Sequence, residues 1–476
     1  MTPNVTDLTG AQPVHIVVLA AGKGTRMRSA VPKVLHHLGG LPMIDHVLRA
    51  ADTLAPKTVT VVVGHQADQV ATHLRHRPEV RTVLQEPQLG TGHALLTTES
   101  VLGRESGTVV LLSGDVPLLT PASLASLLAR HRDAGAAATV VTAMADRPFG
   151  YGRVVRNGGE ITRIVEERDA TPEEREIKEI NAGIYAFELA SLFDALRGVG
   201  DDNSQREYYL PDLVTVYRRQ RKVVSTWTVG NPAEIRGINS RSELAGVALV
   251  MRQRKHEEMM AAGVTLMDPA TTYIDVDVQV GQDTVLYPGV HLEGTTRVGS
   301  SCHVHAGSRL VNAEIGDHVI VLNHCIVTDT RIASHCHIGP FAHLRPDSVL
   351  EERSRVGNFV ELKKTTLGAG SKANHLAYLG DSTIGHDTNI GAGTITCNYD
   401  GMTKHPTIIG SNAFVGSNSS LVAPVKIGDG AYVAAGSAIT EDVPSDALGI
   451  GRSRQENKPE WASKRRAARK PRDGPS

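Results

Sequence analysis

The stretch IGSNAFVGSNSSLVAPVKIGDGAYVAAGSAI, residues 409–439, decides the fold of the second half of the chain. Apolar residues recur in it at every sixth position, namely Ile409, Val415, Leu421, Ile427, Val433 and Ile439. A period of six fits neither the 3.6-residue turn of a helix nor the two-residue alternation of a strand. It fits a prism of short strands in which each strand directs one side chain inward. The coils of such a prism stack at the inter-strand spacing of about 4.8 Å.

The same period extends toward the N-terminus from this stretch. Two earlier runs share it, comprising Val280, Leu286, Leu292, Val298, Val304 and Leu310, and then Ile338, Leu344, Leu350, Val356 and Leu362. The register slips by one residue at Ile315, and the polar segment Asn398–Pro406 interrupts it. We therefore expect a β-helix of six-residue repeats, with one loop leaving the solenoid where functional residues usually gather.

Residues 14–240 have a different texture, in which short apolar runs alternate with helical patterns. The expected strands are Val14–Ala20, Thr58–Val63, Thr108–Ser113 and Ala138–Ala143. This alternation predicts an α/β Rossmann-like domain with a parallel sheet covered on both faces. Ligands of such sheets bind beyond the carboxyl ends of the strands, and Gly22 and Asp115 each follow such an end.

These patterns divide the chain into five segments. We expect a flexible N-terminus (1–13), a nucleotidyltransferase domain (14–241), a linker helix (242–263), a β-helix domain (264–455) and a basic tail (456–476). The linker has helix-forming composition without proline, and Gly263 is a typical stop. The basic residues after Trp461 predict a solvated, disordered end.

Composition excludes several classes of protein. Of 476 residues, 41% are hydrophobic and 21% are charged, with a formal net charge of −1, so neither nucleic acid nor an anionic membrane is an expected partner. The four cysteines form no CxxC pair, which favours free thiols in a reducing compartment. Residues 1–14 lack the pattern of a signal peptide, and the apolar runs are too short to span a bilayer. These features predict a cytoplasmic protein.

The segment LAAGKGTRM, residues 19–27, follows the first strand and is expected to open a helix. Backbone N–H groups of a glycine-rich turn cradle phosphates, and the helix N-terminus adds positive potential. The segment lacks the third glycine of the dinucleotide motif and the GK[ST] ending of a P-loop. Arg26 lies within it and Lys33 follows it, and the two provide the cations that a triphosphate needs.

LAAGKGTRM together with Pro32-Lys33-Val34 resembles the signature of sugar-nucleotide pyrophosphorylases. The motifs QLGTGHA (88–94), SGDVPLL (113–119), GYGRV (150–154), IVEERDA (164–170) and EINAG (179–183) follow in the order of that family. With the β-helix behind them, residues 14–455 resemble the bacterial bifunctional GlmU family, which makes UDP-N-acetylglucosamine for the cell wall. The resemblance implies two activities: acetylation of glucosamine-1-phosphate by acetyl-CoA, then uridylyl transfer from UTP to N-acetylglucosamine-1-phosphate.

The resemblance implies roles for residues of the first half. Those expected at the uridine nucleotide are Leu19, Ala20, Ala21, Gly22, Arg26, Lys33, Gln85, Gly90 and Thr91. Gly152, Glu166 and Asn181 are expected to hold the N-acetylglucosamine part, and Asp115 and Asn239 to hold Mg²⁺. A carboxylate is a suitable hard ligand for Mg²⁺, which otherwise takes phosphates and water. Ser113 departs from some members, which carry an aromatic residue there, and this implies a slightly altered nucleotide pocket.

The resemblance also implies an acetyltransferase site, carried by HLRPDS (343–348), VGNFVELKK (356–364), NHLAYLGD (374–381) and NIGAGTITCNYDG (389–401). His375 is the expected general base, with Glu361 orienting it. The residues expected at the sugar phosphate are Arg345, Lys363, Tyr378 and Asn389. The residues expected at acetyl-CoA are Ala392, Asn398, Tyr399, Ser417, Ala435 and Arg452, with Ser417 or Asn398 at the thioester oxyanion.

The family further implies a left-handed β-helix and a homotrimer with sites between subunits. Two alternatives remain at this point: a glucose-1-phosphate nucleotidyltransferase with a regulatory β-helix, and a non-catalytic scaffold or sensor. The retained Lys33, Asp115 and His375 disfavour the scaffold. The spacing His303-x-His305 invites a zinc site, but no Cys or carboxylate spacing completes it. Cys397 adjoins the expected loop, where we predict an inert small residue rather than a thiol-sensitive one.

Overall fold

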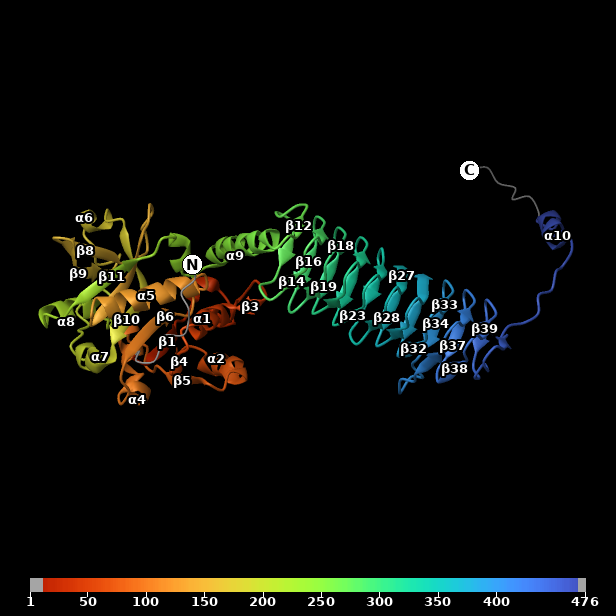
Figure 1. Cartoon of the computed structure of the whole chain (residues 1–476), viewed down its shortest axis with the longest axis horizontal. Coiled ribbons are helices and arrows are strands. Elements are labelled where there is room, and N and C mark those ends of the chain that lie inside the picture. The colour runs from red at the N-terminus through yellow and green to blue at the C-terminus, as the bar shows by residue number, and fades with distance from the viewer. Residues whose placement is uncertain (1–11, 470–476) are drawn as a thin grey trace. The chain divides into compact units, whose positions relative to one another are not determined.

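The computed structural model describes residues 12–469 and divides the chain between Lys255 and His256 into two compact units (Figure 1). Of the expected flexible N-terminus, residues 1–11 lie outside the described part, as do residues 470–476 of the basic tail. Among residues 12–469, no helix is both long and apolar enough to cross a bilayer.

The first unit is built on one mixed sheet. Its main path runs β11-β7-β10-β6-β1-β4-β5, with β8 and β9 attached through β10. The strands are β1 (Val14–Ala20), β4 (Thr58–Val63), β5 (Val80–Leu84), β6 (Thr108–Ser113), β7 (Ala138–Met144), β8 (Arg153–Asn157), β9 (Glu160–Val165), β10 (Glu179–Glu188) and β11 (Val224–Thr228). A separate hairpin pairs β2 (His37–Leu38) with β3 (Leu41–Pro42).

Helices connect these strands. They are α1 (Met43–Asp52), α2 (Ala67–His73), α3 (Thr91–Leu96), α4 (Glu99–Leu102), α5 (Pro121–Asp133), α6 (Pro172–Arg175), α7 (Leu189–Leu196) and α8 (Leu213–Arg219). The helix α9 (Arg241–Ala261) follows the last strand of this sheet and continues past Lys255 into the second unit. Short 3₁₀ turns add η1 (Thr25–Met27), η2 (Lys33–Leu35), η3 (Leu74–His76), η4 (Leu210–Asp212) and η5 (Pro232–Ile235). Two apolar clusters, one containing Val18 and the other Val17, pack on opposite sides of β1, as side-chain alternation along a strand requires.

Two expectations for this unit are wrong. The sheet is not all parallel, because β10 runs antiparallel to both β6 and β7. The glycine-rich segment opens no α-helix either. After Gly24 the chain makes the single 3₁₀ turn η1, and Arg28 adopts a left-handed conformation (φ 48°) that ends it. Any phosphate cradle here therefore rests on loop N–H groups and side chains.

The second unit is a parallel β-helix, as the six-residue period predicts, and it is left-handed, as the family resemblance implies. Three parallel sheets form its walls. The first contains Thr265–Leu266 (β12), Val285–Leu286 (β15), His303–Val304 (β18), Ile320–Val321 (β21), His337–Ile338 (β24), Arg355–Asn358 (β27), Lys372–His375 (β30), Asn389–Ile390 (β33), Phe414–Val415 (β36), Tyr432–Val433 (β39) and Leu448–Gly449 (β41).

The second sheet contains Tyr273–Ile274 (β13), His291–Glu293 (β16), Arg309–Val311 (β19), Ile326–Thr328 (β22), His343–Leu344 (β25), Glu361–Lys363 (β28), Tyr378–Gly380 (β31), Ile395–Cys397 (β34), Ser420–Val422 (β37) and Ala438–Ile439 (β40). The third contains Gln279–Val280 (β14), Arg297–Val298 (β17), Glu314–Ile315 (β20), Arg331–Ile332 (β23), Val349–Leu350 (β26), Thr366–Leu367 (β29), Ser382–Ile384 (β32), Thr407–Ile409 (β35) and Val425–Ile427 (β38).

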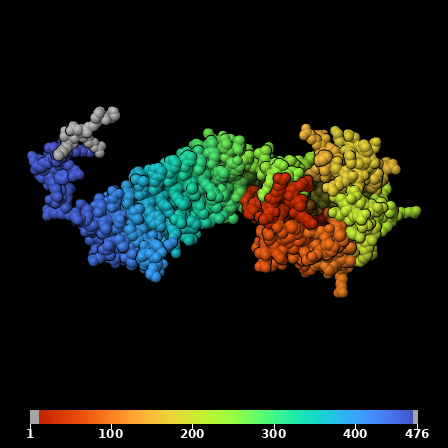
Figure 2. All heavy atoms as spheres, turned by 180° about the vertical axis from the view of Figure 1, so that it is seen from behind, coloured from red at the N-terminus to blue at the C-terminus, as the bar shows by residue number. Residues whose placement is uncertain are grey.

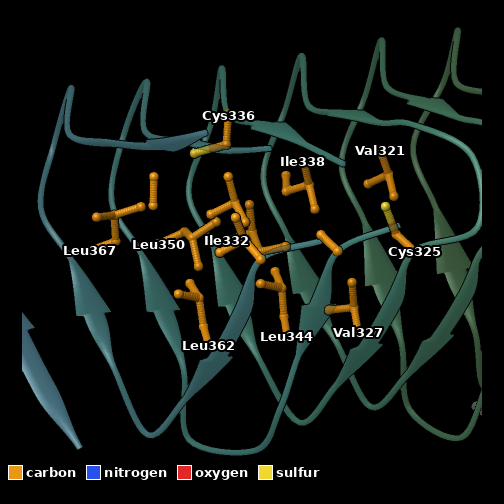
Figure 3. Packing of buried hydrophobic residues seen from close by; sticks show 14 of the residues in the cluster. Val321, Cys325, Val327, Ile332, Cys336, Ile338, Leu344, Leu350, Leu362 and Leu367 are labelled. Atoms are coloured by element: carbon orange, nitrogen blue, oxygen red, sulfur yellow. The ribbon is translucent and has the colours of Figure 1, made fainter. Parts of the chain in front are cut away.

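The repeated apolar side chains fill the interior of this unit. Figure 3 shows Val327, Leu344 and Leu362 stacked from successive coils, each directed inward. Figure 2 shows the atoms of this unit, coloured green to blue, as one continuous elongated body. Leu310 and Leu344 are fully buried, whereas Val280 near the first coil is only partly so.

All four cysteines are free thiols, as predicted. Cys302, Cys325 and Cys336 are buried in the β-helix core, and burial raises the pKa of Cys325 to about 11. Such thiols act as small packing residues. At the C-terminal end, α10 (Trp461–Ala467) forms a helix whose residues are all exposed, so the expected disorder after Trp461 is wrong for this stretch, although its exposure to solvent is confirmed.

Candidate active sites

A cavity of about 450 Å³ opens beyond the carboxyl ends of β1 and β6. Nine predicted nucleotide and metal residues line it: Leu19, Ala20, Ala21, Gly22, Lys33, Gln85, Gly90, Thr91 and Asp115. Residues to which the sequence assigned no role also line it: Lys23, Pro32, Val34, Gln88, Ala94 and Glu207. Ser113, the departure noted in the sequence, lines it as well. Arg26 is exposed on η1 and does not line the cavity.

The wall of this cavity is closely packed around Gly90. Gly90 has a φ of 106°, and a Cβ there would lie 2.8 Å from the Tyr208 carbonyl oxygen, so no other residue fits. The Gln85 side-chain amide donates to the Gly90 carbonyl at 2.9 Å, and Thr91 Oγ1 accepts from the Leu210 N–H at 3.1 Å. These bonds hold Gln85, Gly90 and Thr91 together at one side of the cavity.

Lys33, Asp115 and Asn239 converge although they lie far apart in the sequence. Lys33 Nζ donates to Asp115 Oδ2 in a very short contact and to Asn239 Oδ1 at 3.2 Å. The hydroxyl of Ser113 donates to the other Asp115 oxygen, Oδ1, at 2.7 Å. A carboxylate oxygen and an amide oxygen thus share one cation, which is the type of donor set that suits a hard divalent metal.

Gly152, Glu166 and Asn181 form a second group in this unit. A Cβ on Gly152 would lie 3.3 Å from Glu166 Oε1 and 3.5 Å from Asn181 Cβ. Asn181 Oδ1 accepts from the Tyr185 hydroxyl at 3.0 Å and from the Gly183 N–H at 3.1 Å, so its NH₂ group remains for another acceptor. Burial, aided by Asp169 and Asp212, raises the pKa of Glu166. None of the three lines the cavity itself.

In the β-helix, predicted residues align along one edge of the prism, where the first sheet turns into the second. The backbone carbonyl of each residue at this edge accepts a hydrogen bond from the next coil. The donor is the N–H of the residue just after the one that occupies the same position in that coil. Leu376 donates to Asn358 at 3.1 Å, Gly393 to His375 at 3.3 Å, Asn418 to Ala392 at 2.7 Å and Gly436 to Ser417 at 2.8 Å. The edge thus carries the column Asn358, His375, Ala392, Ser417 and Ala435, and the Arg452 side chain approaches Gly436.

His375 has a partner that differs from the expected one. Its Nδ1 donates to Asn358 Oδ1 at 2.7 Å, which leaves Nε2 as the basic nitrogen. Glu361 does not orient His375. It accepts from Arg345 Nη1 at 2.8 Å instead, because Arg345 and Glu361 lie on adjacent coils of the second sheet.

Basic residues gather at the edge of the prism that follows the second sheet. Lys363 Nζ lies 4.0 Å from Asp381 Oδ2, and Asn398 Nδ2 donates to that same oxygen at 2.5 Å. Lys404, in the loop that leaves the solenoid, lies close to Lys363, whose ammonium lowers the pKa of Lys404. Two adjacent ammonium groups suit a dianionic phosphate.

The remaining predicted residues occupy other positions on these coils. Tyr378 lies beside Glu361 on the second sheet, and its hydroxyl reaches over Gly380. Tyr399 is exposed in the loop, where it pairs with Lys404 and its hydroxyl donates to the Gly401 carbonyl at 2.6 Å. Asn389 lies on the first sheet opposite Lys372, and no hydrogen bond joins it to the other predicted residues within 12–469.

Sequence reasoning missed Asn358, Asp381 and Lys404. Their signal was spacing: Asn358 precedes His375 by 17 residues, one coil of the solenoid, as Asp381 precedes Asn398. Lys404 lies in the loop already expected to carry function. A separate group of possible metal ligands, Asp45, His73 and His76, lies outside the cavity lining. A hydrogen bond of 3.0 Å between His73 and Asp45 explains why these side chains lie close together.

Known protein families match both halves of the chain. Residues 16–209 match the family model of the MobA-like NTP transferase domain, and residues 406–441 match the hexapeptide repeat of succinyl-transferase. The chain is 50% identical to the bifunctional protein GlmU of Trichlorobacter lovleyi, over 94% of this chain and 98% of that protein. The GlmU proteins of Koribacter versatilis (46% identity, 97% and 99%) and an Exiguobacterium species (49% identity, 93% and 98%) are similar along nearly their whole lengths.

The chain belongs to the bifunctional GlmU family. The family resemblance expected from the motifs is thereby confirmed, as is the prediction of a nucleotidyltransferase joined to an acyltransferase of cell-wall synthesis. Membership in the GlmU family also implies nucleotide and other small-molecule substrates, a divalent metal and oligomerisation.

Proposed function

We propose that the two groups of residues described above catalyse successive steps of UDP-N-acetylglucosamine synthesis. The β-helix residues acetylate glucosamine-1-phosphate, and the residues around the first cavity transfer UMP to the product. The observation that carries this proposal is the convergence of Lys33, Asp115 and Asn239 at a cavity lined by a glycine-rich loop. The column containing Asn358 and His375 supports the second activity.

In uridylyl transfer, a phosphate oxygen of N-acetylglucosamine-1-phosphate attacks the α-phosphorus of UTP. A new P–O bond forms, and the bond to pyrophosphate breaks. Such transfers depend on positioning and charge neutralisation rather than on a covalent enzyme intermediate. Gln85, Gly90 and Thr91 hold the uracil, and Gly152, Glu166 and Asn181 hold the sugar. Arg26 and Lys33 neutralise charge on the leaving pyrophosphate.

We assign the divalent metal as Mg²⁺, held by Asp115 and Asn239. The donor chemistry fits, because both residues already turn an oxygen toward one shared cation, the Lys33 ammonium. Mg²⁺ prefers such hard oxygen ligands, completed by phosphates and water. When bound, it supplies charge neutralisation to the phosphates.

In acetyl transfer, the amine of glucosamine-1-phosphate attacks the thioester carbon of acetyl-CoA. An N–C bond forms, the C–S bond breaks, and the thiol of CoA leaves. His375 Nε2 accepts the amine proton, while Asn358 holds Nδ1 protonated. Arg345, Lys363 and Lys404 bind the phosphate. Acetyl-CoA lies along the edge that carries Ala392, Ser417, Ala435 and Arg452, flanked by Asn398 and Tyr399.

We further propose that the oligomer is a homotrimer formed through the β-helix and that the enzyme acts in the cytoplasm. UTP and acetyl-CoA are substrates of that compartment, and the four free thiols suit its reducing conditions. Sedimentation equilibrium of the pure protein measures the trimer directly.

One assay tests both activities. The pure protein is incubated with glucosamine-1-phosphate, acetyl-CoA, UTP and Mg²⁺, and free thiol and pyrophosphate are followed separately. Appearance of both products supports the proposal. Pyrophosphate that appears only after addition of N-acetylglucosamine-1-phosphate would leave the β-helix without acetyltransferase activity and would favour a nucleotidyltransferase with a regulatory β-helix.

A further inference from the structure

The Lys33 ammonium lies at the point where the two proposed metal ligands meet. It contacts Asp115 Oδ2 and Asn239 Oδ1 at the same time. These side chains come from the 3₁₀ turn η2, the segment just after β6 and the segment before α9, so only tertiary structure brings them together. The lysine and the carboxylate are largely shielded, with exposed side-chain fractions of 14% and 13%. The pair is therefore less screened than a surface ion pair.

The carboxylate of Asp115 is divided between two partners. Oδ1 accepts from the Ser113 hydroxyl at 2.7 Å, which leaves Oδ2 to Lys33. A metal held by Asp115 and Asn239 through the oxygens turned toward each other would need the two atoms that Lys33 now occupies. The ammonium and a divalent ion cannot share one short contact with Oδ2, because like charges at that separation repel strongly.

The stem of Lys33 is confined, while its charged end borders open space. A Cβ on Gly24 would lie 2.8 Å from Lys33 Cβ, so the glycine-rich loop packs directly on the first carbon of the side chain. The side chain also lines the cavity together with Gly22 and Lys23. Rotation about the outer bonds of a lysine moves its ammonium by several ångströms while the stem stays packed.

We infer that Lys33 is a positioning residue that holds Asp115 and Asn239 until the divalent ion replaces it, and then moves to the phosphates of the nucleotide. This inference rests on the proposed uridylyltransferase function and deepens it. Its consequence is that the free enzyme binds the metal weakly, since the ion must first break a shielded ion pair. Metal and nucleotide then load together, because the nucleotide offers the displaced ammonium a new anionic partner.

Direct metal binding tests this without measuring activity. Mn²⁺ serves as the probe, and its loss from solution is followed by electron paramagnetic resonance in the absence of nucleotide. We expect Lys33→Met to bind Mn²⁺ about tenfold or more tightly than the wild type, because the competing cation is gone. Lys23→Met is the matched control, since Lys23 lines the same cavity, and we expect its Mn²⁺ affinity to equal that of the wild type.

The double variant Lys33→Met, Asp115→Asn identifies the site. We expect it to lose the gain, which assigns the tighter binding to Asp115. Circular dichroism confirms that each variant is folded. Equal or weaker Mn²⁺ binding by folded Lys33→Met overturns the inference, as does a gain that survives Asp115→Asn. If the wild type forms no pyrophosphate from UTP and N-acetylglucosamine-1-phosphate with Mn²⁺, the proposed function itself fails, whatever the binding data show.

Discussion

Asn358 Oδ1 accepts a hydrogen bond of 2.7 Å from His375 Nδ1, and the two residues lie side by side on neighbouring coils of the β-helix. The pairing follows from the solenoid, which brings residues 17 apart into register at this edge. An amide oxygen only accepts, so the bond selects the histidine tautomer with a proton on Nδ1 and a lone pair on Nε2. The backbone repeat thus prepares the imidazole for proton transfer.

Removal of this acceptor should slow acetyl transfer. We expect Asn358→Ala to lower kcat for CoA release by about tenfold or more, because an unoriented base loses part of the advantage of general base catalysis. Asn358→Asp keeps an oxygen acceptor beside Nδ1 and should therefore retain most of the wild-type kcat. Equal losses of kcat in the two variants would contradict the assigned contact.

The two activities should respond separately to substitution. We expect Asp115→Ala to lower pyrophosphate formation by about 100-fold or more, because the metal and Lys33 lose their shared carboxylate. Acetyl transfer should remain. His375→Ala should instead lower thiol release by about 100-fold or more and spare pyrophosphate formation from N-acetylglucosamine-1-phosphate. Loss of both activities in either folded variant would refute two independent sites.

Lys404 should contribute to binding of the sugar phosphate. Its ammonium lies within hydrogen-bonding reach of Lys363, and this contact, together with the repulsion between the two charges, lowers the pKa of Lys404. A phosphate between them relieves that repulsion. We expect Lys404→Met to raise KM for glucosamine-1-phosphate about tenfold, with a smaller change in kcat. Lys426→Met, which removes an exposed lysine on β38, is the matched control. A change in kcat alone would assign Lys404 to another step.

The β-helix was predictable because each six-residue unit repeats the same local structure, a short strand with one buried apolar side chain. One inward side chain per strand is enough to fix which residues are buried, and Leu344 and Ile427 lie in the core as the period requires. The mixed sheet of the first unit was less predictable. The direction of β10 depends on pairing with β6 and β7, which are distant in sequence, and an apolar run does not encode direction.

Site residues were predictable where they lie within a sequence motif. They were not predictable where only a tertiary contact marks them. The motifs located Lys33, Asp115 and His375, but their partners follow from tertiary register. Glu361 illustrates the difference: the family resemblance implied contact with His375, whereas the coil places Glu361 opposite His343, where its carboxylate accepts from Arg345. The cavity lining at Ser113 likewise depends on how the end of β6 meets its neighbours.

A buried histidine in the first unit makes its stability depend on pH. His131, on α5, is 3% exposed, and its Nδ1 bonds Thr139 Oγ1 at 3.0 Å. Burial lowers its pKa from 6.5 to about 4. The unfolded chain therefore binds a proton more readily than the folded chain between these values. The stability that comes from neutral His131 is complete above pH 6.5 and is lost as pH falls toward 4.

We expect the free energy of unfolding to fall by about 2 kcal/mol through this residue between pH 7 and pH 5. His131→Gln, which keeps a neutral polar group, should remove that part of the pH dependence. Urea unfolding is followed by the fluorescence of Trp227 on β11, in a Trp461→Phe background so that only the first unit reports. Since other groups titrate equally in both proteins, the difference isolates His131. Equal losses in the two proteins would mean that His131 is protonated in the folded state.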